Sequence, residues 1–315
     1  MREIDSSLFE RKVLVTGAAG FLGAALCQRL QRSGAEVHGV SRRLRRGGGV
    51  RWWAGDLATL DNTRKILLEV RPDVVFHLAS YVSGSRDVRT IERTVRDNLL
   101  STVNVLTGSS EAGAGRVVLA GSMEECYPVL GESVPASPYA ATKTAAATYA
   151  QLFHALYGLS VVNLRVFMVY GPGQQDLAKL IPYVTVGLLR GESPRLGSGI
   201  RHIDWVYVDD VVEAFVAAAT AAGVDGANLD VGSGQLVQTR RLIEHLTRLV
   251  DGPGRPQFGA LPDRPRESER VAELAPARQM LGWEPRTTLH EGLTQTVAWF
   301  HDRHTPAHSL TTLTG

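Results

Sequence analysis

Cysteine is nearly absent from this chain of 315 residues, which contains only Cys27 and Cys126. Two cysteines cannot build a disulfide framework, and they show neither a CxxC motif nor the spacing of metal ligands. An excess of one charge is also lacking, because 34 Lys and Arg face 32 Asp and Glu and leave a net charge of +2. A balance this even offers little attraction for a polyanion. We therefore expect no metal site, no nucleic-acid partner and a reducing, cytoplasmic location.

Long apolar runs are missing as well. No stretch approaches the roughly 20 apolar residues that a membrane-spanning helix requires, and the charged opening sequence MREIDSSLFERK contains no signal core. The sequence therefore predicts no association with a membrane. Lysine is scarce too, since only positions 12, 65, 143 and 179 carry it. The surroundings of each lysine are informative for that reason.

Short apolar strands alternate with helical segments through the first half of the chain. Strands that are apolar throughout and are separated by helices predict a parallel sheet covered on both faces. From residue 171 onward glycine and proline become frequent, which indicates a smaller, loop-rich lobe. Strands are expected at 12–16, 36–40, 73–80, 116–122 and 159–171, and helices at 61–70, 86–112, 137–158, 208–222 and 239–250.

The segment VTGAAGFLG places three glycines between the first strand and a helix. Gly17, Gly20 and Gly23 recur at intervals of three residues. Glycines in this setting permit a tight turn, close approach of a pyrophosphate to the backbone, and close packing of the helix on the strand. The pattern is weak alone, but its place at a strand-to-helix junction predicts a dinucleotide site.

The residues after the second strand distinguish the two common dinucleotides. NAD calls for an acidic residue that binds the ribose 2′-hydroxyl, whereas NADP calls for a cation. Here Ser41, Arg42 and Arg43 follow the strand without a carboxylate. Arginine can bind a phosphate through two parallel hydrogen bonds, although a solvated basic turn is the alternative. The sequence favours NADP(H) as the cofactor and places NAD(H) second.

The segment SPYAATK sets Tyr139 and Lys143 one helical turn apart on the same face, about 6 Å along the axis. A tyrosine has a pKa of about 10, so acting as a base near neutrality requires a stabilised phenolate. A neighbouring ammonium and a positively charged nicotinamide can provide that stabilisation. The pair therefore indicates an acid/base site, with a helix-surface pair as the alternative.

At this point the chain resembles the extended short-chain dehydrogenase/reductases that act on nucleotide-diphosphate sugars. The resemblance implies an α/β fold: a Rossmann-type doubly wound parallel sheet over 1–170, to which 205–232 return, and a smaller C-terminal substrate-binding lobe over 171–315. It also implies a homodimer and a nucleotide-diphosphate-sugar substrate. The ordered segments that carry it, within about residues 11–300, are TGAAGFLG, GDL, HLAS, YAATK, LRVFMVYGPGQ, DWVYVDDVVEAF, NLDVGSG and LGWEPRTTLHEGL.

The same resemblance implies roles for individual residues. Tyr139 would be the general acid/base, Lys143 would orient it and hold the nicotinamide ribose, and Asn98 would order the proton relay. The implied cofactor contacts are Gly17, Gly20, Phe21, Leu22, Gly23, Ser41, Arg42, Arg43, Asp56, Leu57, Leu78, Ala79, Ser80, Asn98, Tyr139 and Lys143. The implied substrate contacts are Tyr81, Met123, Glu124, Arg201 and Arg264.

The segment GSMEECYP departs from the family pattern. Relatives commonly carry Ser or Thr where this chain has Met123, and methionine cannot donate a hydrogen bond. Ser122 is the nearest hydroxyl, although neighbouring strand residues point to opposite faces. A buried Glu124 or Glu125 with a raised pKa could donate instead, while a solvated loop position is the alternative for each. We expect Ser122 and Glu124 to join Tyr139 and Lys143 as catalytic residues.

The arginines after the second strand favour net reduction, because NADPH is the pool that cells keep reduced. The leading hypothesis is NADPH-dependent reduction of the C4 ketone of a nucleotide-diphosphate 4-keto-6-deoxysugar in deoxysugar biosynthesis. One alternative is a nucleotide-diphosphate-sugar 4-epimerase or 4,6-dehydratase with resident NAD(P). A second alternative is a non-catalytic NADP-binding protein, which the methionine at position 123 suggests.

Overall fold

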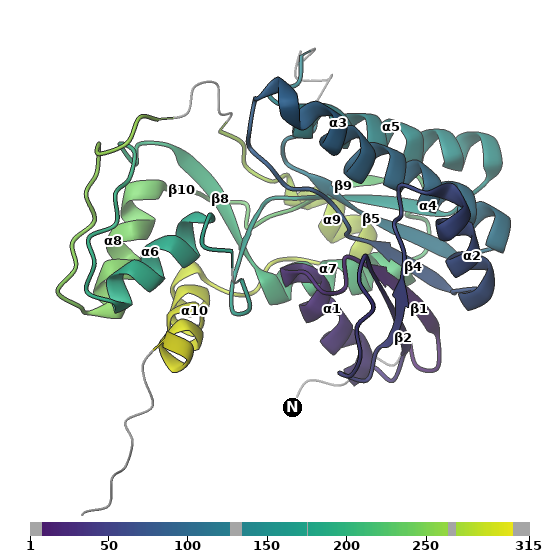
Figure 1. Cartoon of the computed structure of the whole chain (residues 1–315), viewed down its shortest axis with the longest axis horizontal. Coiled ribbons are helices and arrows are strands. Elements are labelled where there is room, and N and C mark those ends of the chain that lie inside the picture. The colour runs from purple at the N-terminus through teal and green to yellow at the C-terminus, as the bar shows by residue number, and fades with distance from the viewer. Residues whose placement is uncertain (1–7, 127–133, 175, 264–268, 305–315) are drawn as a thin grey trace, which may run out of the picture.

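The computed structural model in Figure 1 describes residues 8–126, 134–174, 176–263 and 269–304. Its larger part is a sheet of seven parallel strands in the order β3-β2-β1-β4-β5-β6-β9. The order reverses between β1 and β4, which opens a crevice at the carboxyl ends of these strands. The predicted Rossmann-type α/β fold is thereby confirmed. The strands are β1 (Lys12–Thr16), β2 (Glu36–Ser41), β3 (Arg51–Ala54), β4 (Val74–His77), β5 (Arg116–Ser122), β6 (Val161–Val166) and β9 (Asn228–Val231).

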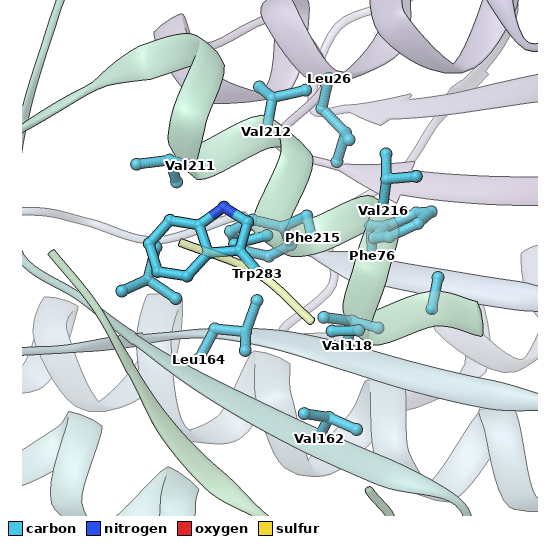
Figure 2. Close-up of a cluster of buried hydrophobic side chains, with 14 of the residues drawn as sticks. Leu26, Phe76, Val118, Val162, Leu164, Val211, Val212, Phe215, Val216 and Trp283 are labelled. Carbon is cyan, nitrogen blue, oxygen red and sulfur yellow. The ribbon is translucent and has the colours of Figure 1, made fainter. Parts of the chain in front are cut away.

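Helices cover both faces of this sheet because successive strand residues point to opposite sides. In β1, Val13 and Val15 enter one hydrophobic cluster and Leu14 enters another. The first cluster lies against α1 (Phe21–Arg32) and α7 (Val208–Thr220), and Figure 2 shows residues of both helices with those of the strands. The second lies against three further helices, which are α2 (Leu60–Val70), α4 (Ser101–Ala112) and α5 (Pro138–Tyr157).

A second sheet of three strands, in the order β10-β8-β7, forms the core of the smaller part. It lies at one end of the molecule with three helices around it, on the left in Figure 1. The strands are β7 (Met168–Tyr170), β8 (His202–Tyr207) and β10 (Leu236–Gln238). The helices are α6 (Leu180–Leu189), α8 (Thr239–Val250) and α10 (Leu289–His304), while α9 (Leu274–Leu281) packs on β9 of the large sheet.

The single strand expected over 159–171 is two strands in the structure. The amide of Phe167 donates to the carbonyl of Val231, the last residue of β9, at 2.9 Å. Beyond that point β9 offers no partner, so Met168 pairs with Trp205 of β8 instead. The chain thus leaves the large sheet at Phe167, and it returns through α7 and β9.

The helix expected over 86–112 is likewise interrupted. It consists of η1 (Val88–Thr90), α3 (Ile91–Thr94), a π-helical turn η2 (Val95–Leu100) and α4. A π-helical turn widens the helix by one residue and is often found at functional sites.

Two further expectations concern surfaces. No helix among the described residues is long and apolar enough to cross a membrane. The helix α5 buries Ala150 in the core and exposes Tyr149, Leu152 and Leu156. The homodimer itself stays a prediction.

Candidate active site

The glycine loop lies at the crevice, between β1 and α1. Gly17 adopts a φ of 67°, and a Cβ there would lie 2.8 Å from the amide nitrogen of Ala79. A Cβ on Gly23 would lie 2.2 Å from the carbonyl oxygen of Gly17. Gly20 caps α1 without a side chain, and the first turn of α1 contains no acidic residue. The free amides and the helix dipole therefore fit a pyrophosphate, as a dinucleotide site requires.

A buried hydrogen-bonded chain holds the end of β4 against this loop. Thr16 Oγ1 accepts from the amides of Leu78 and Ala79, each at 3.1 Å, and lies 2.8 Å from His77 Nδ1. The two amides use both lone pairs of the Thr16 hydroxyl, so Thr16 donates its one proton to His77 Nδ1. The ring proton of His77 is therefore on Nε2, which donates to Thr102 Oγ1 at 3.0 Å. Burial lowers the pKa of His77 to about 3, which keeps the ring neutral.

Asn98, in the π-helical turn, joins the segment after β4 to α5. Its Oδ1 accepts from Ser80 Oγ at 3.0 Å and from the amide of Tyr81 at 2.6 Å. Its Nδ2 donates to the carbonyl of Tyr81 at 3.1 Å and to Thr142 Oγ1 at 3.3 Å. The side chain is buried and has a partner for each of its polar atoms. Asn98 therefore fixes the backbone beside the crevice.

Tyr139 and Lys143 lie buried on one face of α5, at the carboxyl end of β5. Ser137 caps this helix by accepting from the amide of Ala140 at 3.1 Å. The ammonium of Lys143 donates to the carbonyl of Ala120 at 2.7 Å and lies 5.9 Å from the centre of the Tyr139 ring. The structure thus brings the two residues of the SPYAATK segment together at the sheet edge.

The acidities of this pair differ from the simple expectation of a lowered tyrosine pKa. Burial raises the pKa of Tyr139, and a hydrogen bond with Ser122 partly opposes that shift. Burial lowers the pKa of Lys143 to about 8, while the Glu125 carboxylate opposes the change. In the protein alone Tyr139 therefore stays protonated, because desolvation of the phenolate outweighs the Ser122 hydrogen bond and the charges of Glu124 and Glu125 act in the same direction as desolvation.

The hydroxyl beside Tyr139 is that of Ser122, the last residue of β5. Met123, expected to contact the substrate, has only 5% of its surface exposed and lies in the same hydrophobic cluster as Phe167. Met123 follows the last residue of β5 and lies in the same cluster as Val118, so the chain turns after Ser122 and the alternation along the strand does not extend to Met123. The methionine at position 123 therefore removes no hydroxyl from the Tyr139 side of the strand.

The two glutamates that follow have different surroundings. Glu124 is half-buried and accepts from Ser137 Oγ at 3.3 Å. Glu125 is 3% exposed, and its two oxygens accept from the amide of Ser122 at 2.8 Å and from Asn163 Nδ2 at 3.1 Å. Burial raises the pKa of Glu125 to about 7, an effect that the Ser122 amide and then the Lys143 charge oppose.

Glu125 and Lys143 line a cavity of about 10 Å³ with His77, Thr102 and Asn163. A space of this size can hold one water, and the polar lining offers it several partners. The sequence left Glu124 and Glu125 as alternatives and favoured Glu124, because adjacent glutamates look alike, whereas Glu125 is the carboxylate that lies beside Lys143. The one available signal was Gly121, where a Cβ would lie 2.4 Å from Glu125 Oε1.

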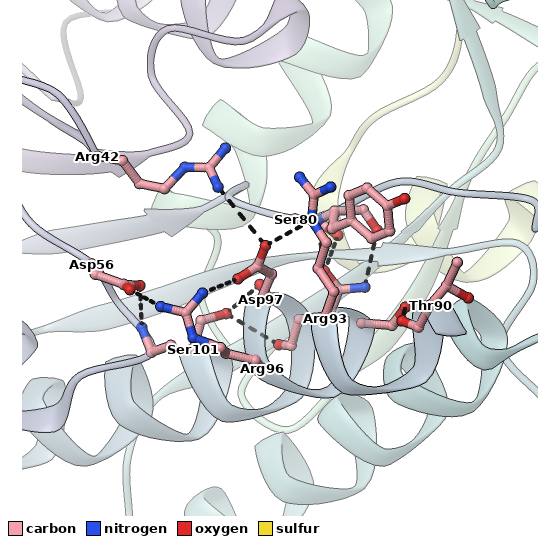
Figure 3. A network of polar contacts seen from close by, with 12 residues as sticks. Arg42, Asp56, Ser80, Thr90, Arg93, Arg96, Asp97 and Ser101 are labelled. Atoms are coloured by element: carbon pink, nitrogen blue, oxygen red, sulfur yellow. Dashed lines mark hydrogen bonds and ion pairs between the residues drawn. The ribbon is translucent and has the colours of Figure 1, made fainter. Parts of the chain in front are cut away.

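The basic segment after β2 lies at the carboxyl end of that strand. Ser41 Oγ donates to the carbonyl of Arg43 at 2.5 Å, and Arg42 lies 3.9 Å from Asp97 (Figure 3). Asp56 forms an ion pair with Arg96. These contacts place the expected cofactor residues Ser41, Arg42 and Asp56 at the carboxyl ends of β2 and β3.

Three other expected contacts lie further along the chain. The ring of Tyr81 packs 3.9 Å from the Arg93 guanidinium. Arg201 directly precedes β8, and its carbonyl accepts from the amide of Thr239 at 2.8 Å. Arg264 lies outside the described residues. Among the residues that are described, no group of three or more His, Cys, Asp or Glu could hold a metal ion.

The strand order, the glycine loop and the buried tyrosine and lysine together define an extended short-chain dehydrogenase/reductase. The chain belongs to the NAD dependent epimerase/dehydratase family, which it matches over residues 13–232. This confirms the resemblance inferred from the ordered motifs.

Known members of the family are similar to nearly the whole chain. The UDP-glucose 4-epimerase of Mycolicibacterium smegmatis is 32% identical, with 93% of this chain and 99% of that protein covered. A structure of UDP-glucose 4-epimerase from Thermotoga maritima with UDP-glucose has a TM-score of 0.85 at 27% identity, covering 93% and 100%. MoeE5 in complex with UDP-glucuronic acid and NAD has a TM-score of 0.83 at 33% identity, covering 93% and 99%. A nicotinamide dinucleotide cofactor is therefore typical of proteins with this architecture.

Proposed function

We propose that this chain is a nucleotide-diphosphate-sugar 4-epimerase that keeps its nicotinamide dinucleotide bound through turnover. The observation that carries the proposal is the buried acid/base group formed by Tyr139, Lys143 and Ser122 at the carboxyl end of β5. Interconversion of C4 epimers needs one group that takes and returns the proton of the C4 hydroxyl. The likeness to UDP-glucose 4-epimerases over nearly the whole chain supports the same reaction.

Different residues of the chain would exchange the proton, stabilise the phenolate and hold the cofactor. A bound dinucleotide would supply reversible hydride transfer at C4. Tyr139 would exchange the proton of the C4 hydroxyl through its phenolic oxygen, and Ser122, which hydrogen-bonds that oxygen, would stabilise its deprotonated form. Lys143, held by the carbonyl of Ala120, would keep positive charge beside the ring. Gly17, Gly20 and the first turn of α1 would hold the pyrophosphate.

A 4,6-dehydratase would need a further acid and base at C5 and C6 of the sugar. Glu125, which lies beside Lys143, is one candidate for such an acid or base. Its two oxygens, however, accept hydrogen bonds from the Ser122 amide and the Asn163 side chain inside the protein. Glu124 is the remaining candidate, and it is half-buried beside Ser137. The arrangement therefore favours epimerisation over dehydration.

The expected NADPH-dependent ketone reduction has weaker support. The relatives from Mycolicibacterium smegmatis and Thermotoga maritima are named as UDP-glucose 4-epimerases and not as ketone reductases. The MoeE5 structure contains NAD. Arg42, whose position favoured NADP, is close to an aspartate in the structure. A purely binding role is also disfavoured, because Tyr139, Lys143 and Ser122 are all in place. We propose NAD as the resident cofactor.

The test is a product assay with purified protein and no added cofactor. UDP-glucose, UDP-glucuronic acid, UDP-N-acetylglucosamine and dTDP-glucose are each incubated, and products are identified by NMR. We expect one substrate to reach equilibrium with its C4 epimer, and the nucleotide released on denaturation to be a nicotinamide dinucleotide. Steady NADPH consumption with a 4-keto-6-deoxysugar nucleotide, without any epimer, would establish the reductase instead.

Replacement of Gly23 by alanine should weaken NAD⁺ binding by at least about tenfold, or about 1.4 kcal/mol. The new Cβ would lie 2.2 Å from the Gly17 carbonyl oxygen, so the phosphate-binding loop must move away from α1. Calorimetric titration of nucleotide-free protein measures the effect. Gly223→Ala is the control. A Cβ there contacts no atom within 4 Å, but the φ of 71° strains the turn before β9, so this variant should lose stability and still bind NAD⁺ like wild type. Equal NAD⁺ affinity of Gly23→Ala and wild type would contradict the proposed binding of the pyrophosphate by the glycine loop.

A further inference from the structure

Asp97 lies at the centre of a group of arginines, as Figure 3 shows. Its carboxylate is 3.1 Å from Arg96, 3.5 Å from Arg93 and 3.9 Å from Arg42. Only 15% of the Asp97 side chain is exposed, whereas 71% of Arg42 is exposed. Asp97 is therefore a partly buried carboxylate, and Arg42 is its exposed partner at the outer side.

The network spans the carboxyl ends of neighbouring strands. Arg42 follows β2, and Arg96 contacts both Asp97 and Asp56, which follows β3. In this fold the residues after the second strand contact the adenosine ribose of a dinucleotide. The Asp97 carboxylate thus faces the guanidinium that would otherwise be available to a 2′-phosphate.

We infer that Asp97 determines which dinucleotide the site prefers, by holding Arg42 and by repelling a 2′-phosphate. The inference rests on the dinucleotide binding in the proposed function. A 2′-phosphate bound to Arg42 would place its negative charge beside a carboxylate that two further arginines keep in position. The 2′-hydroxyl of NAD carries no charge and meets no such repulsion.

Asp97 lowers the positive charge that this network offers to a phosphate. Arg42, Arg93 and Arg96 with Asp56 and Asp97 leave a net charge of +1 within the network, and loss of Asp97 would leave +2. The pair between Arg42 and Asp97 is exposed and long, so its own strength is small. Arg42 is therefore free to turn to a phosphate once the carboxylate is removed. Asp97 reconciles the basic segment after β2 with a preference for NAD.

The first experiment measures the dissociation constants of NAD⁺ and NADP⁺ by calorimetry on nucleotide-free protein. We expect Asp97→Asn to lower the ratio Kd(NADP⁺)/Kd(NAD⁺) by about tenfold, the equivalent of 1.4 kcal/mol. Asp87→Asn is the matched control, because it removes the same charge at the residue that caps the start of the same helical run, where Asp87 pairs with Arg89. That control should leave the ratio unchanged. An unchanged ratio in Asp97→Asn, or an equal shift in Asp87→Asn, would overturn the inference.

Arg42→Gln provides a second, independent measurement. In the otherwise native protein we expect the ratio to stay within about twofold, because the Asp97 carboxylate beside Arg42 offsets the attraction of the guanidinium for a 2′-phosphate. In the Asp97→Asn background the same change should restore the native ratio. A large loss of NADP⁺ affinity in Arg42→Gln alone would show that Arg42 already serves the phosphate, which would overturn the inference. Dinucleotide binding without epimerase activity would count against the proposed function only, whereas binding of neither dinucleotide would overturn both.

Discussion

Tyr139→Phe should lower kcat for epimerisation by about 10³-fold while leaving NAD⁺ affinity unchanged. The phenolic oxygen is the group that exchanges the proton of the C4 hydroxyl, and phenylalanine keeps the buried ring without that oxygen. Because Tyr139 is buried beside Ser122 and Lys143, no bulk water replaces the lost group directly. Product formation with saturating sugar nucleotide measures kcat, and calorimetry measures the affinity.

Tyr157→Phe is the matched control for this result. Tyr157 is on the same helix as Tyr139, but it is exposed. It should therefore retain native kcat and affinity. If Tyr139→Phe kept more than about a tenth of the native rate, the acid/base role of Tyr139 would have to be abandoned.

Glu125→Ala should lower the free energy of unfolding by about 3–5 kcal/mol. The change removes the acceptor of the Ser122 amide and the counter-charge of the Lys143 ammonium. It also removes one of the two acceptors of Asn163 Nδ2, which keeps its contact with Asn228. Urea unfolding followed by circular dichroism measures the effect. Glu124→Ala is the matched control, since Glu124 is half-buried and has one long contact with Ser137. Glu124→Ala should lower the free energy of unfolding by less than about 1.5 kcal/mol. An equal loss in both variants would contradict the buried role of Glu125.

Glu125→Gln should change how the free energy of unfolding depends on pH. The raised pKa of Glu125 determines the direction of that change. Burial raises the pKa of Glu125 from 4.5 to about 7, so the folded state holds more protons than the unfolded state between these values. The free energy of unfolding contributed by this group therefore falls as pH rises from about 4.5 to about 7. Glu125→Gln should flatten that fall.

Lys143 acts in the opposite sense and at higher pH. Its pKa falls from 10.5 to about 8 on folding, so the unfolded state holds more protons in that range and stability rises with pH there. Urea titrations at a series of pH values separate the two effects. If Glu125→Gln and the native protein lost stability equally between about pH 5 and pH 7, the carboxylate would not be buried as described.

Local patterns account for the part of the fold and site that could be predicted. The spacing of Gly17, Gly20 and Gly23 and the one-turn separation of Tyr139 and Lys143 involve few residues each, so their meaning depends little on distant segments. The passage between the two sheets at Phe167 was not predictable, because an apolar run continues through it and only the length of β9 ends the pairing.

The sequence by itself determined the alternation of strands and helices, the glycine loop and the tyrosine and lysine on one helix face. These features follow from side-chain periods and backbone sterics within short segments. Only the tertiary structure decided that Met123 lies in the core, that Glu125 rather than Glu124 lies beside Lys143, and that Asp97 faces Arg42. Each of these depends on packing between elements that are remote in the chain. Burial and nearby charge set the chemistry of a side chain there, and no local sequence pattern records either of them.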